Sequence, residues 1–579
     1  MKKALLTAAL AILALSCCTR PPKDGVHSLT LLTTNDVHGT WFDSTYVDGN
    51  TRRSLIAVST IIDSVRAADG KDNVVLIDAG DCLQGDNAPY YFNYVDTLSP
   101  HLFPRLASYM GYDAIVVGNH DIETGHRVYD RVAKELKGKG IPFLAGNAIH
   151  TSDGKPYFPL YTIVKRAGLK VAILGYTNPN MKGWLQEDLW RGMTFENLIP
   201  MVQEDVDRVT AKEKPHVVIV AVHSGNGNGD GKSLESQGLD LLSTLHGVDF
   251  LICSHDHRPA LDGRESTLLI NSGSHSRNVG YGKIEVTVKD GKVVDKDLSS
   301  RLIMVRRENP DKAMREAFRS DYEAVKAFTL RPVGELEGDL VTRESFRGMC
   351  PYINLIHTVC LEASGARISF AAPLSYNKTI KAGPLAFNDL FTIYPYENQL
   401  FVVKMTGEEI KGYLEESYDG WLASPGSGHA LGIREQKDQR TGGTNWSFAE
   451  RTYNFDSAAG INYTVDITKE KGNRVEISTL ANGEEFGPDK EYLVAMTSYR
   501  ASGGGGLMPR GAGIKSLDGR VAAKLPEIRN LVYDYLKGHG SISPEETGKT
   551  SLIGSWRFIP DGTAAKAIDE DMALVFGRR

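Results

Sequence analysis

The stretch "LTLLTTNDVHG", residues 29–39, joins an apolar run to an acid and an imidazole two positions apart, Asp36 and His38. Its apolar part is typical of a strand that is buried on both faces of a sheet. Asp-x-His after such a strand is more often a polar turn than a metal site when it stands alone. The stretch therefore indicates a metal site only if other parts of the chain supply further ligands.

The same pattern recurs along the first half of the chain, where apolar runs end abruptly in polar and often ionisable residues. The other runs are "NVVLIDAGDCLQG" (73–85), "YDAIVVGNHD" (112–121), "HVVIVAVHSG" (216–225), "VDFLICSHDH" (248–257) and "TLLINSGSHS" (267–276). Amphipathic helical patterns at 54–69 and 197–214 lie between them. Residues 28–305 are therefore predicted to form a layered α/β sandwich domain, with ligands gathered at the carboxyl ends of its strands.

The second half of the chain has a different character. Residues 306–335 contain an amphipathic helical pattern followed by Pro332 and Gly334, and they predict a linker helix and hinge. Strand signals and a capping box from Thr406 to Glu409 predict a separate α+β domain over about 336–550. Residues 551–579 are expected to be a short terminal extension.

Composition agrees with a globular protein of more than one domain. A chain of 579 residues is too long for one ordinary core. Its apolar content of 41% and charged content of 24% are typical of soluble globular proteins. A net charge of −6 gives no reason to expect binding to polymeric nucleic acid.

The N-terminus indicates export. Two lysines precede an apolar stretch, Ala4 to Leu15, and then "SCCTR". Residues 1–17 therefore resemble a bacterial lipoprotein signal with Cys17 as the lipid-modified residue, and ordinary secretion is the alternative. We expect an exported, periplasmic or cell-envelope lipoprotein that touches the membrane only through this anchor. Four further cysteines are too few for a disulfide framework, and a Cys350–Cys360 bridge remains open.

Metal-type donors stand at the ends of five successive predicted strands. They are Asp36, His38, Asp81, Asn119, His223, His255 and His257. Each has an ordinary structural explanation when taken alone, but the ordered set is hard to assign to chance. Carboxylate, imidazole and amide oxygen suit borderline divalent metals such as Zn, Mn or Fe, so we expect two divalent ions.

The blocks "NDVHG", "GDCLQG", "GNHD", "VHSG" and "SHDH" resemble, in this order, those of the calcineurin-like metallophosphoesterases. The two-domain layout is similar to the bacterial 5′-nucleotidase and 2′,3′-cyclic-nucleotide 2′-phosphodiesterase (3′-nucleotidase) family. This resemblance implies that Asp36, His38 and His257 hold one metal. It also implies that Asn119, His223 and His255 hold the other and that Asp81 bridges the two.

The resemblance further implies hydrolysis at phosphorus, since paired cations neutralise a phosphate and activate water. His120 is expected to stabilise the transition state or protonate the leaving oxygen, with Glu123 fixing its tautomer. Glu123 stands where the family often has Asp, and Ser254 stands where it usually has Gly. His275 is equally consistent with a place at the site and with a packing role.

Substrate specificity is expected to come from aromatic residues of the second domain. By resemblance, Tyr499 forms one face of a clamp around the nucleotide base, and Phe455 or Tyr453 forms the other. Gly505 stands where 5′-nucleotidases commonly carry an Asp that binds ribose hydroxyls. The lack of this Asp favours substrates whose ribose hydroxyls carry the phosphate, because a carboxylate at position 505 would repel that phosphate.

The sequence thus predicts an exported dinuclear phosphohydrolase acting on 2′,3′-cyclic nucleotides and 3′-nucleotides, releasing nucleoside and phosphate. A 5′-nucleotidase or nucleotide-sugar hydrolase is the main alternative, followed by a nucleotide-binding surface lipoprotein without turnover. The expected partner is a small nucleotide, not a nucleic acid polymer, and we expect a monomer.

Overall fold

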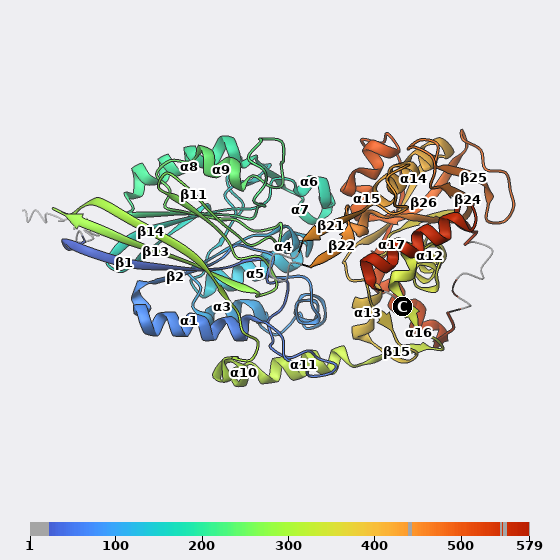
Figure 1. The fold of residues 1–579 in the computed structure, drawn as a ribbon. Coiled ribbons are helices and arrows are strands. Elements are labelled where there is room, and N and C mark those ends of the chain that lie inside the picture. Colours follow the sequence, from blue (N-terminus) through green and yellow to red (C-terminus); the bar gives the residue numbers. More distant parts are fainter. Residues whose placement is uncertain (1–21, 438–442, 545–546, 548–552, 578–579) are drawn as a thin grey trace, which may run out of the picture.

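The computed structural model describes residues 22–437, 443–544, 547 and 553–577. The predicted signal and Cys17 lie outside the described residues. Within these ranges every helix is too short or too polar to cross a bilayer. The described chain forms two domains joined by a helical linker that runs along one edge of the molecule (Figure 1).

The first domain is a sandwich of two sheets. One sheet has the order β14 (Lys292–Met304), β13 (Asn278–Lys289), β1 (Gly25–Thr34), β2 (Val74–Asp78), β3 (Ala114–Val116), β4 (Phe143–Leu144). The other has the order β11 (Ala260–Arg264), β12 (Thr267–Asn271), β10 (Phe250–Ile252), β9 (Val217–Val222), β7 (Leu169–Tyr176), β6 (Tyr161–Arg166). The apolar faces of the two sheets pack together, as the predicted layered architecture requires.

Side-chain alternation along β1 explains how the layers are built. Leu31 points into the core between the sheets, whereas Leu32 packs against the helices that cover the first sheet. Helices α1 (Leu55–Asp69) and α8 (Leu198–Glu213) form where the periodicity predicts them and cover opposite sheets. Leu29, Leu31 and Leu32 are 0% exposed, in keeping with a strand that is buried on both faces.

Parallel pairing brings the strand ends together. Strands β1 to β4 run parallel in the first sheet, and β7, β9, β10 and β12 run parallel in the second. Their carboxyl ends therefore lie at one end of the sandwich, which faces the second domain (Figure 1).

The linker consists of α10 (Lys312–Ala317) and α11 (Arg319–Thr329) and is broken at Phe318. The linker packs three side chains, Met314, Phe318 and Val325, into the core of the first domain. It is therefore part of that domain's packing. The second domain begins at β15 (Pro332–Leu336), within the range predicted as the hinge.

The second domain has the predicted α+β character. Its main sheet has the order β23 (Ser457–Ala459), β17 (Ile368–Ala371), β26 (Glu491–Thr497), β20 (Gln399–Thr406), β27 (Val521–Glu527). Helices α12 (Pro351–Ser364) and α14 (Gly407–Trp421) pack against it. The Thr406–Glu409 capping box forms as predicted at the start of α14. Cys350 and Cys360 are both free thiols, so the bridge left open by the sequence is not made.

Residues 556–576 are part of the second domain's core, which corrects the expectation of a terminal extension. Strand β29 (Trp556–Ile559) pairs in parallel with β24 (Ile461–Asp466). Helix α17 (Thr563–Phe576) packs its apolar face into the same core. The physical reason is that Trp556, at the start of β29, buries a large apolar surface, with 6% of the residue exposed.

Candidate metal centre and active site

The predicted ligands stand on tight loops at the strand ends, with unusual backbone conformations. Positive φ angles are found at Asp36 (48°), His38 (44°), Asp81 (61°), His255 (72°) and His257 (60°). Such conformations are uncommon for residues other than glycine and concentrate at functional sites. The positions of these ligand side chains are therefore set by the folded structure and not by the backbone preferences of the residues themselves.

Two groups of donor atoms converge, and we name them site A and site B. In site A, ligand atoms of Asp36, His38 and His257 lie within 4.8 Å of one another. In site B, those of Asp81, His223 and His255 do the same. The family resemblance implies the same two sets but with Asp81 as a bridge, whereas these distances group Asp81 with site B.

Asn119 and Asp81 complete the arrangement. Asn119 Oδ1 lies 3.0 Å from His223 Nε2 and 2.9 Å from His255 Nδ1, at site B. Asp81 Oδ2 lies 3.1 Å from His223 Nε2 and 3.9 Å from His38 Nε2, so one carboxylate oxygen faces both sites.

The unsatisfied donor atoms fit a pair of divalent ions. Asp81 Oδ2 is buried, and within the described part of the chain its contact with His223 Nε2 at 3.1 Å lacks the geometry of a hydrogen bond, which is costly unless a cation lies nearby. His38 Nε2 and His257 Nε2 approach to 2.8 Å, so two ring nitrogens aim at one small space. Oxygen and nitrogen donors of this kind suit Zn, Mn or Fe, and the fold implies divalent ions.

Two glycines and a buried acid shape the loop that carries Asp81. A Cβ on Gly118 would lie 2.1 Å from Asp81 Oδ1, and one on Gly80 would lie 2.7 Å from His223 Nδ1. Asp121, which is 0% exposed, accepts hydrogen bonds from the backbone N–H groups of Asp81 and three other residues. The "GD" and "GNHD" blocks are therefore joined by close packing and by the hydrogen bonds to Asp121.

Ser254, the departure from the family pattern, supports His223. Its hydroxyl donates to the carbonyl of Ala79 at 3.0 Å and lies 3.1 Å from His223 Nδ1. His223 Nδ1 also lies 2.8 Å from the Ala79 carbonyl, an arrangement that leaves Nε2 free to face site B. The substitution thus adds a polar contact behind a ligand without blocking the site.

Electrostatics at the site follow from burial and from the paired carboxylates. Burial lowers the pKa of His255 to about 3 and that of His257 to about 4, which keeps both imidazoles neutral as ligands. Burial also raises the pKa of Asp36 to about 8. Although burial opposes ionisation of Asp81 too, His223 and His120 hold the pKa of that carboxyl well below its ordinary value.

His120 is not a member of site A or site B, and its ring pairs with Glu123. The Nδ1 atom of His120 lies 2.6 Å from Glu123 Oε2. Burial opposes protonation of His120, but Asp81 and the bond to Glu123 raise its pKa to about 9. The longer Glu side chain therefore reaches the position from which it can orient the imidazole. Gln84 Nε2 donates to the same Glu123 oxygen at 2.9 Å.

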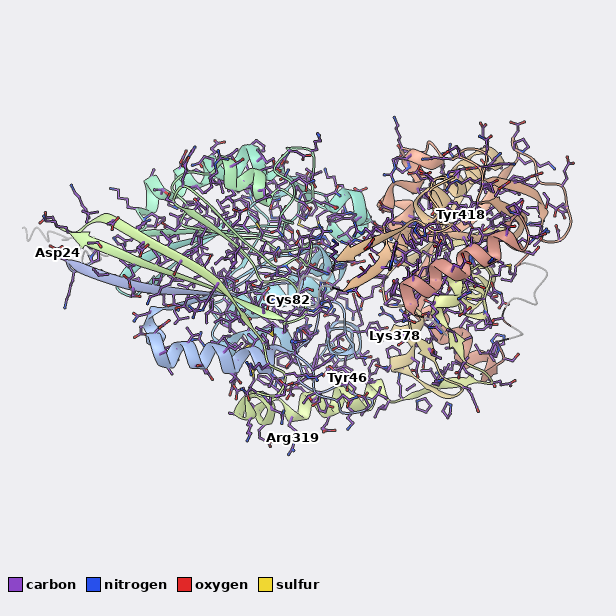
Figure 2. The ribbon with its side chains drawn as sticks, viewed as in Figure 1. Asp24, Tyr46, Cys82, Arg319, Lys378 and Tyr418 are labelled. Atoms are coloured by element: carbon purple, nitrogen blue, oxygen red, sulfur yellow. The ribbon has the colours of Figure 1, made fainter. Side chains whose placement is uncertain are left out.

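A cavity of about 1090 Å³ between the domains joins the metal centre to the second domain. Its walls include Asp81 and His120 on one side and Tyr453 and Tyr499 on the other. Lys378, which also lines it, lies on the side of the second domain that faces the first (Figure 2). The rings of Tyr453 and Tyr499 are 6.4 Å apart and nearly perpendicular, at 85°, so a base can stack between them only after one ring turns.

Phe455 does not reach this cavity, which corrects one of the predicted clamp residues. It is 0% exposed and stacks on Trp421 at 5.3 Å in the core of the second domain. Tyr453 lies within a 3₁₀ turn, Thr452–Asn454, and Phe455 follows directly after it, so strand-like alternation does not place the two rings on one face. Tyr453 is therefore the clamp candidate that remains.

Three residues near the site were not predicted from the sequence. Trp184 stacks on His255, with ring centres 5.0 Å apart and planes inclined by 25°. Gln84 and Asp121 support Glu123 and Asp81 respectively. The "GDCLQG" and "GNHD" blocks contained Gln84 and Asp121, whereas nothing in the local sequence marked Trp184. His275, left open above, lines the cavity with its ring 5.2 Å from that of His38.

Comparison with known proteins agrees with this geometry. Residues 29–259 match the family described as calcineurin-like phosphoesterase, and residues 332–510 match the 5′-nucleotidase C-terminal domain. The chain therefore combines a calcineurin-like phosphoesterase domain with a 5′-nucleotidase C-terminal domain. Both kinds of domain indicate action on phosphoric esters, so the chain is a metallophosphoesterase and a hydrolase.

Individual relatives of this two-domain phosphoesterase are distant. The 2′,3′-cyclic-nucleotide 2′-phosphodiesterase/3′-nucleotidase of Yersinia enterocolitica is 23% identical over 94% of this chain and 91% of its own length. The trifunctional nucleotide phosphoesterase YfkN of Bacillus subtilis is also 23% identical, and the chain spans only 39% of it. A crystal structure from Staphylococcus aureus assigned as a 5′-nucleotidase has a TM-score of 0.74 and 18% identity, covering 92% of this chain and 99% of its own.

Proposed function

We propose that this phosphoesterase hydrolyses 2′,3′-cyclic nucleotides and 3′-nucleotides to nucleoside and phosphate. The observation that carries the proposal is that sites A and B and the tyrosines Tyr453 and Tyr499 line one cavity of about 1090 Å³. That volume accommodates a nucleotide, since ligand pockets of about 300–1,000 Å³ hold drug-sized molecules. A phosphate at the metal centre and a base at the tyrosines then belong to one molecule.

The chain's own residues take the following roles in the proposed reaction. Asp36, His38 and His257 would hold one divalent ion and Asn119, His223 and His255 the other, with Asp81 shared by the two sets of donors. When bound, such ions neutralise phosphate charge and activate water. His120 lines the cavity and is oriented through Nδ1 by Glu123, so its other ring nitrogen, Nε2, is the atom that would donate a proton to the leaving ribose oxygen.

Gly505 supports the cyclic and 3′-nucleotide branch. A Cβ at this position would lie 2.4 Å from both Arg500 Nη1 and Asn454 Oδ1, and the backbone has φ of +72°. The loop therefore leaves no room for the ribose-binding Asp of 5′-nucleotidases. The guanidinium of Arg500 and the amide of Asn454 occupy that space instead, so position 505 presents no carboxylate to a ribose edge that carries phosphate.

A 5′-nucleotidase or nucleotide-sugar hydrolase is the second candidate, because the same centre can cleave any phosphate ester that reaches it. A binding protein without turnover fits less well, since every predicted ligand of sites A and B is present and converges.

Phosphate release from 2′,3′-cyclic AMP, 3′-AMP, 5′-AMP and UDP-glucose tests the proposal. We expect the first two to be hydrolysed with the highest kcat/KM, activity to disappear on chelation, and Zn, Mn or Fe to restore it. A clear preference for 5′-AMP or UDP-glucose would contradict the proposed branch, and bound metal without hydrolysis would favour the binding protein.

Export and lipid anchoring complete the proposal. They are supported by the pattern of residues 1–17, with Cys17 as the modified residue. Strand β1 begins at the end of the first domain remote from the second, so a tether there leaves the cavity accessible (Figure 1). Metabolic labelling with palmitate should mark the wild type and not Cys17→Ser, whereas equal labelling of both would refute the anchor.

A further inference from the structure

Arg500 lies behind the two tyrosines and connects the loops that carry them. The residue is 2% exposed, and its Nε and Nη2 atoms donate to the Asp456 carboxylate at 2.9 and 2.7 Å. Its Nη1 atom donates to Asn454 Oδ1 at 2.9 Å and to the Gly504 carbonyl at 3.1 Å. Nη2 also donates to the carbonyl of Tyr453. One guanidinium thus joins the 453–456 loop to the glycine-rich loop that follows Tyr499.

Two glycines let this arrangement close around Tyr499. A Cβ on Gly504 would lie 2.4 Å from the Tyr499 ring, so the bare backbone packs directly against that ring. The Arg500 guanidinium carbon lies 5.2 Å from the centre of the same ring. A Cβ on Gly505 would lie 2.4 Å from Arg500 Nη1. Tyr499 is therefore supported by Gly504 and Arg500, while it still lines the cavity.

The buried charge of Arg500 is balanced and its geometry is specific. Asp456, 2% exposed, accepts both hydrogen bonds of the guanidinium fork and a further one from Tyr413. Lysine carries the same charge but cannot make a planar fork and reach a carbonyl and an amide at once. The position therefore requires arginine for shape rather than for charge alone.

We propose that Arg500 is a positioning residue that assembles the nucleoside clamp, setting the separation of Tyr453 and Tyr499 through Asn454, Asp456 and Gly505. The inference rests on the proposed function, because it assigns these tyrosines to the base of a nucleotide. It adds that recognition of the nucleoside depends on a buried guanidinium that lies behind the rings.

The test compares substrates with and without a nucleoside. Arg500→Lys and Gly505→Ala should each raise KM for 3′-AMP and 2′,3′-cyclic AMP by about tenfold, the loss of one stacked base, with kcat little changed. Bis(p-nitrophenyl) phosphate has no nucleoside, so its kcat/KM should stay within about twofold.

Gly503→Ala is the matched control for backbone strain in the same loop. Gly503 also has a positive φ, +93°, but among the described residues a Cβ there would meet nothing within 4 Å. We expect it to leave KM for nucleotides nearly unchanged. If Gly505→Ala and Gly503→Ala behave alike, or if Arg500→Lys lowers turnover of both substrate types equally, the role is merely structural and the inference is wrong.

Adenosine binding separates failure of this inference from failure of the proposed function. Calorimetry on the full chain should show weaker adenosine binding to Gly505→Ala than to wild type, whether or not any nucleotide is hydrolysed. Asn454→Ala provides a second variant if Arg500→Lys does not fold, and it should also weaken binding. Wild-type protein that binds no adenosine, or variants that bind it equally well, would overturn the inference.

Discussion

At the scale of single residues, this site depends on side chains held by strained backbone and by close packing. Asp36 and Asp81 both have positive φ, and Gly80 and Gly118 are needed because a Cβ would collide with ligand side chains. The free energy that stabilises these conformations comes from buried hydrogen bonds such as those accepted by Asp121. Changing a ligand should therefore affect metal content more than folding.

Asp81→Asn should lose at least one metal ion and more than about a hundredfold in kcat/KM, because even residues that only support ligands contribute 10–100-fold. Metal analysis and release of p-nitrophenol from bis(p-nitrophenyl) phosphate measure the two effects. Asp205→Asn, which changes a buried acid paired with Arg208 on α8, is the control and should keep full metal content. Full activity in Asp81→Asn would contradict the dinuclear centre.

Trp184→Leu should weaken metal binding at site B by up to about tenfold, since an aromatic stack contributes about 0.5–1.5 kcal/mol. The indole restrains the plane of the His255 ring, which is one of the donor groups of site B. Competition with a chromogenic chelator measures the affinity. Trp184→Phe retains a stacking ring, so its metal affinity should remain close to that of wild type. Equal metal affinities of Trp184→Leu and wild type would show that the indole does not support site B.

At the scale of helices and strands, periodic patterns were predictable and contacts between distant segments were not. The apolar runs, α1, α8 and the capping box of α14 follow from local sequence, so the sandwich and the seven predicted ligands could be proposed together. Phe455 was misplaced because a short 3₁₀ turn interrupts the local alternation. The roles of Arg500 and Trp184 depend on residues far away in sequence.

Thr406→Ala should destabilise the second domain by about 1 kcal/mol, because the Thr406 side chain caps α14 and accepts from the Glu409 N–H. Urea unfolding followed by fluorescence measures the change, and hydrolysis of bis(p-nitrophenyl) phosphate should be unaffected. Thr444→Ala, at an exposed site on β22 (Thr444–Phe448), is the control. An unchanged unfolding midpoint would show that the cap contributes little.

At the scale of the whole molecule, a group of acids lies where the two domains meet. Gln84 and Tyr94 of the first domain contact Glu397 of the second, each at 3.4 Å. Arg529, 0% exposed, lies 3.4 Å from the same carboxylate. Glu123 and Glu527 line a small cavity beside it. Three carboxyl groups thus gather near one guanidinium at this point of the domain junction.

The junction should lose stability as pH rises. Burial and the neighbouring Glu397 raise the pKa of Glu527 from its ordinary 4.5 to about 8, so the folded state favours the protonated acid. This contribution is fully present below pH 4.5 and is lost as pH rises through 8. Thermal unfolding from pH 5 to 9 should show a steeper decline for wild type than for Glu527→Gln. The exposed Glu476→Gln serves as control, and identical slopes in all three proteins would contradict the prediction.

The place of β29 in the second domain has a consequence for how the protein is made. Strand β24, near the middle of that domain's sequence, obtains its parallel neighbour only from residues 556–559. Domains otherwise tend to fold in order as the chain is synthesised. The first domain can therefore fold early, whereas the second stays incomplete until residues 556–576 have emerged, and until then the apolar surface that contacts Trp556 and α17 is exposed to aggregation or to proteases. Chain termination before residue 556 should accordingly leave the domain that carries Tyr453 and Tyr499 incomplete and spare the domain that carries sites A and B.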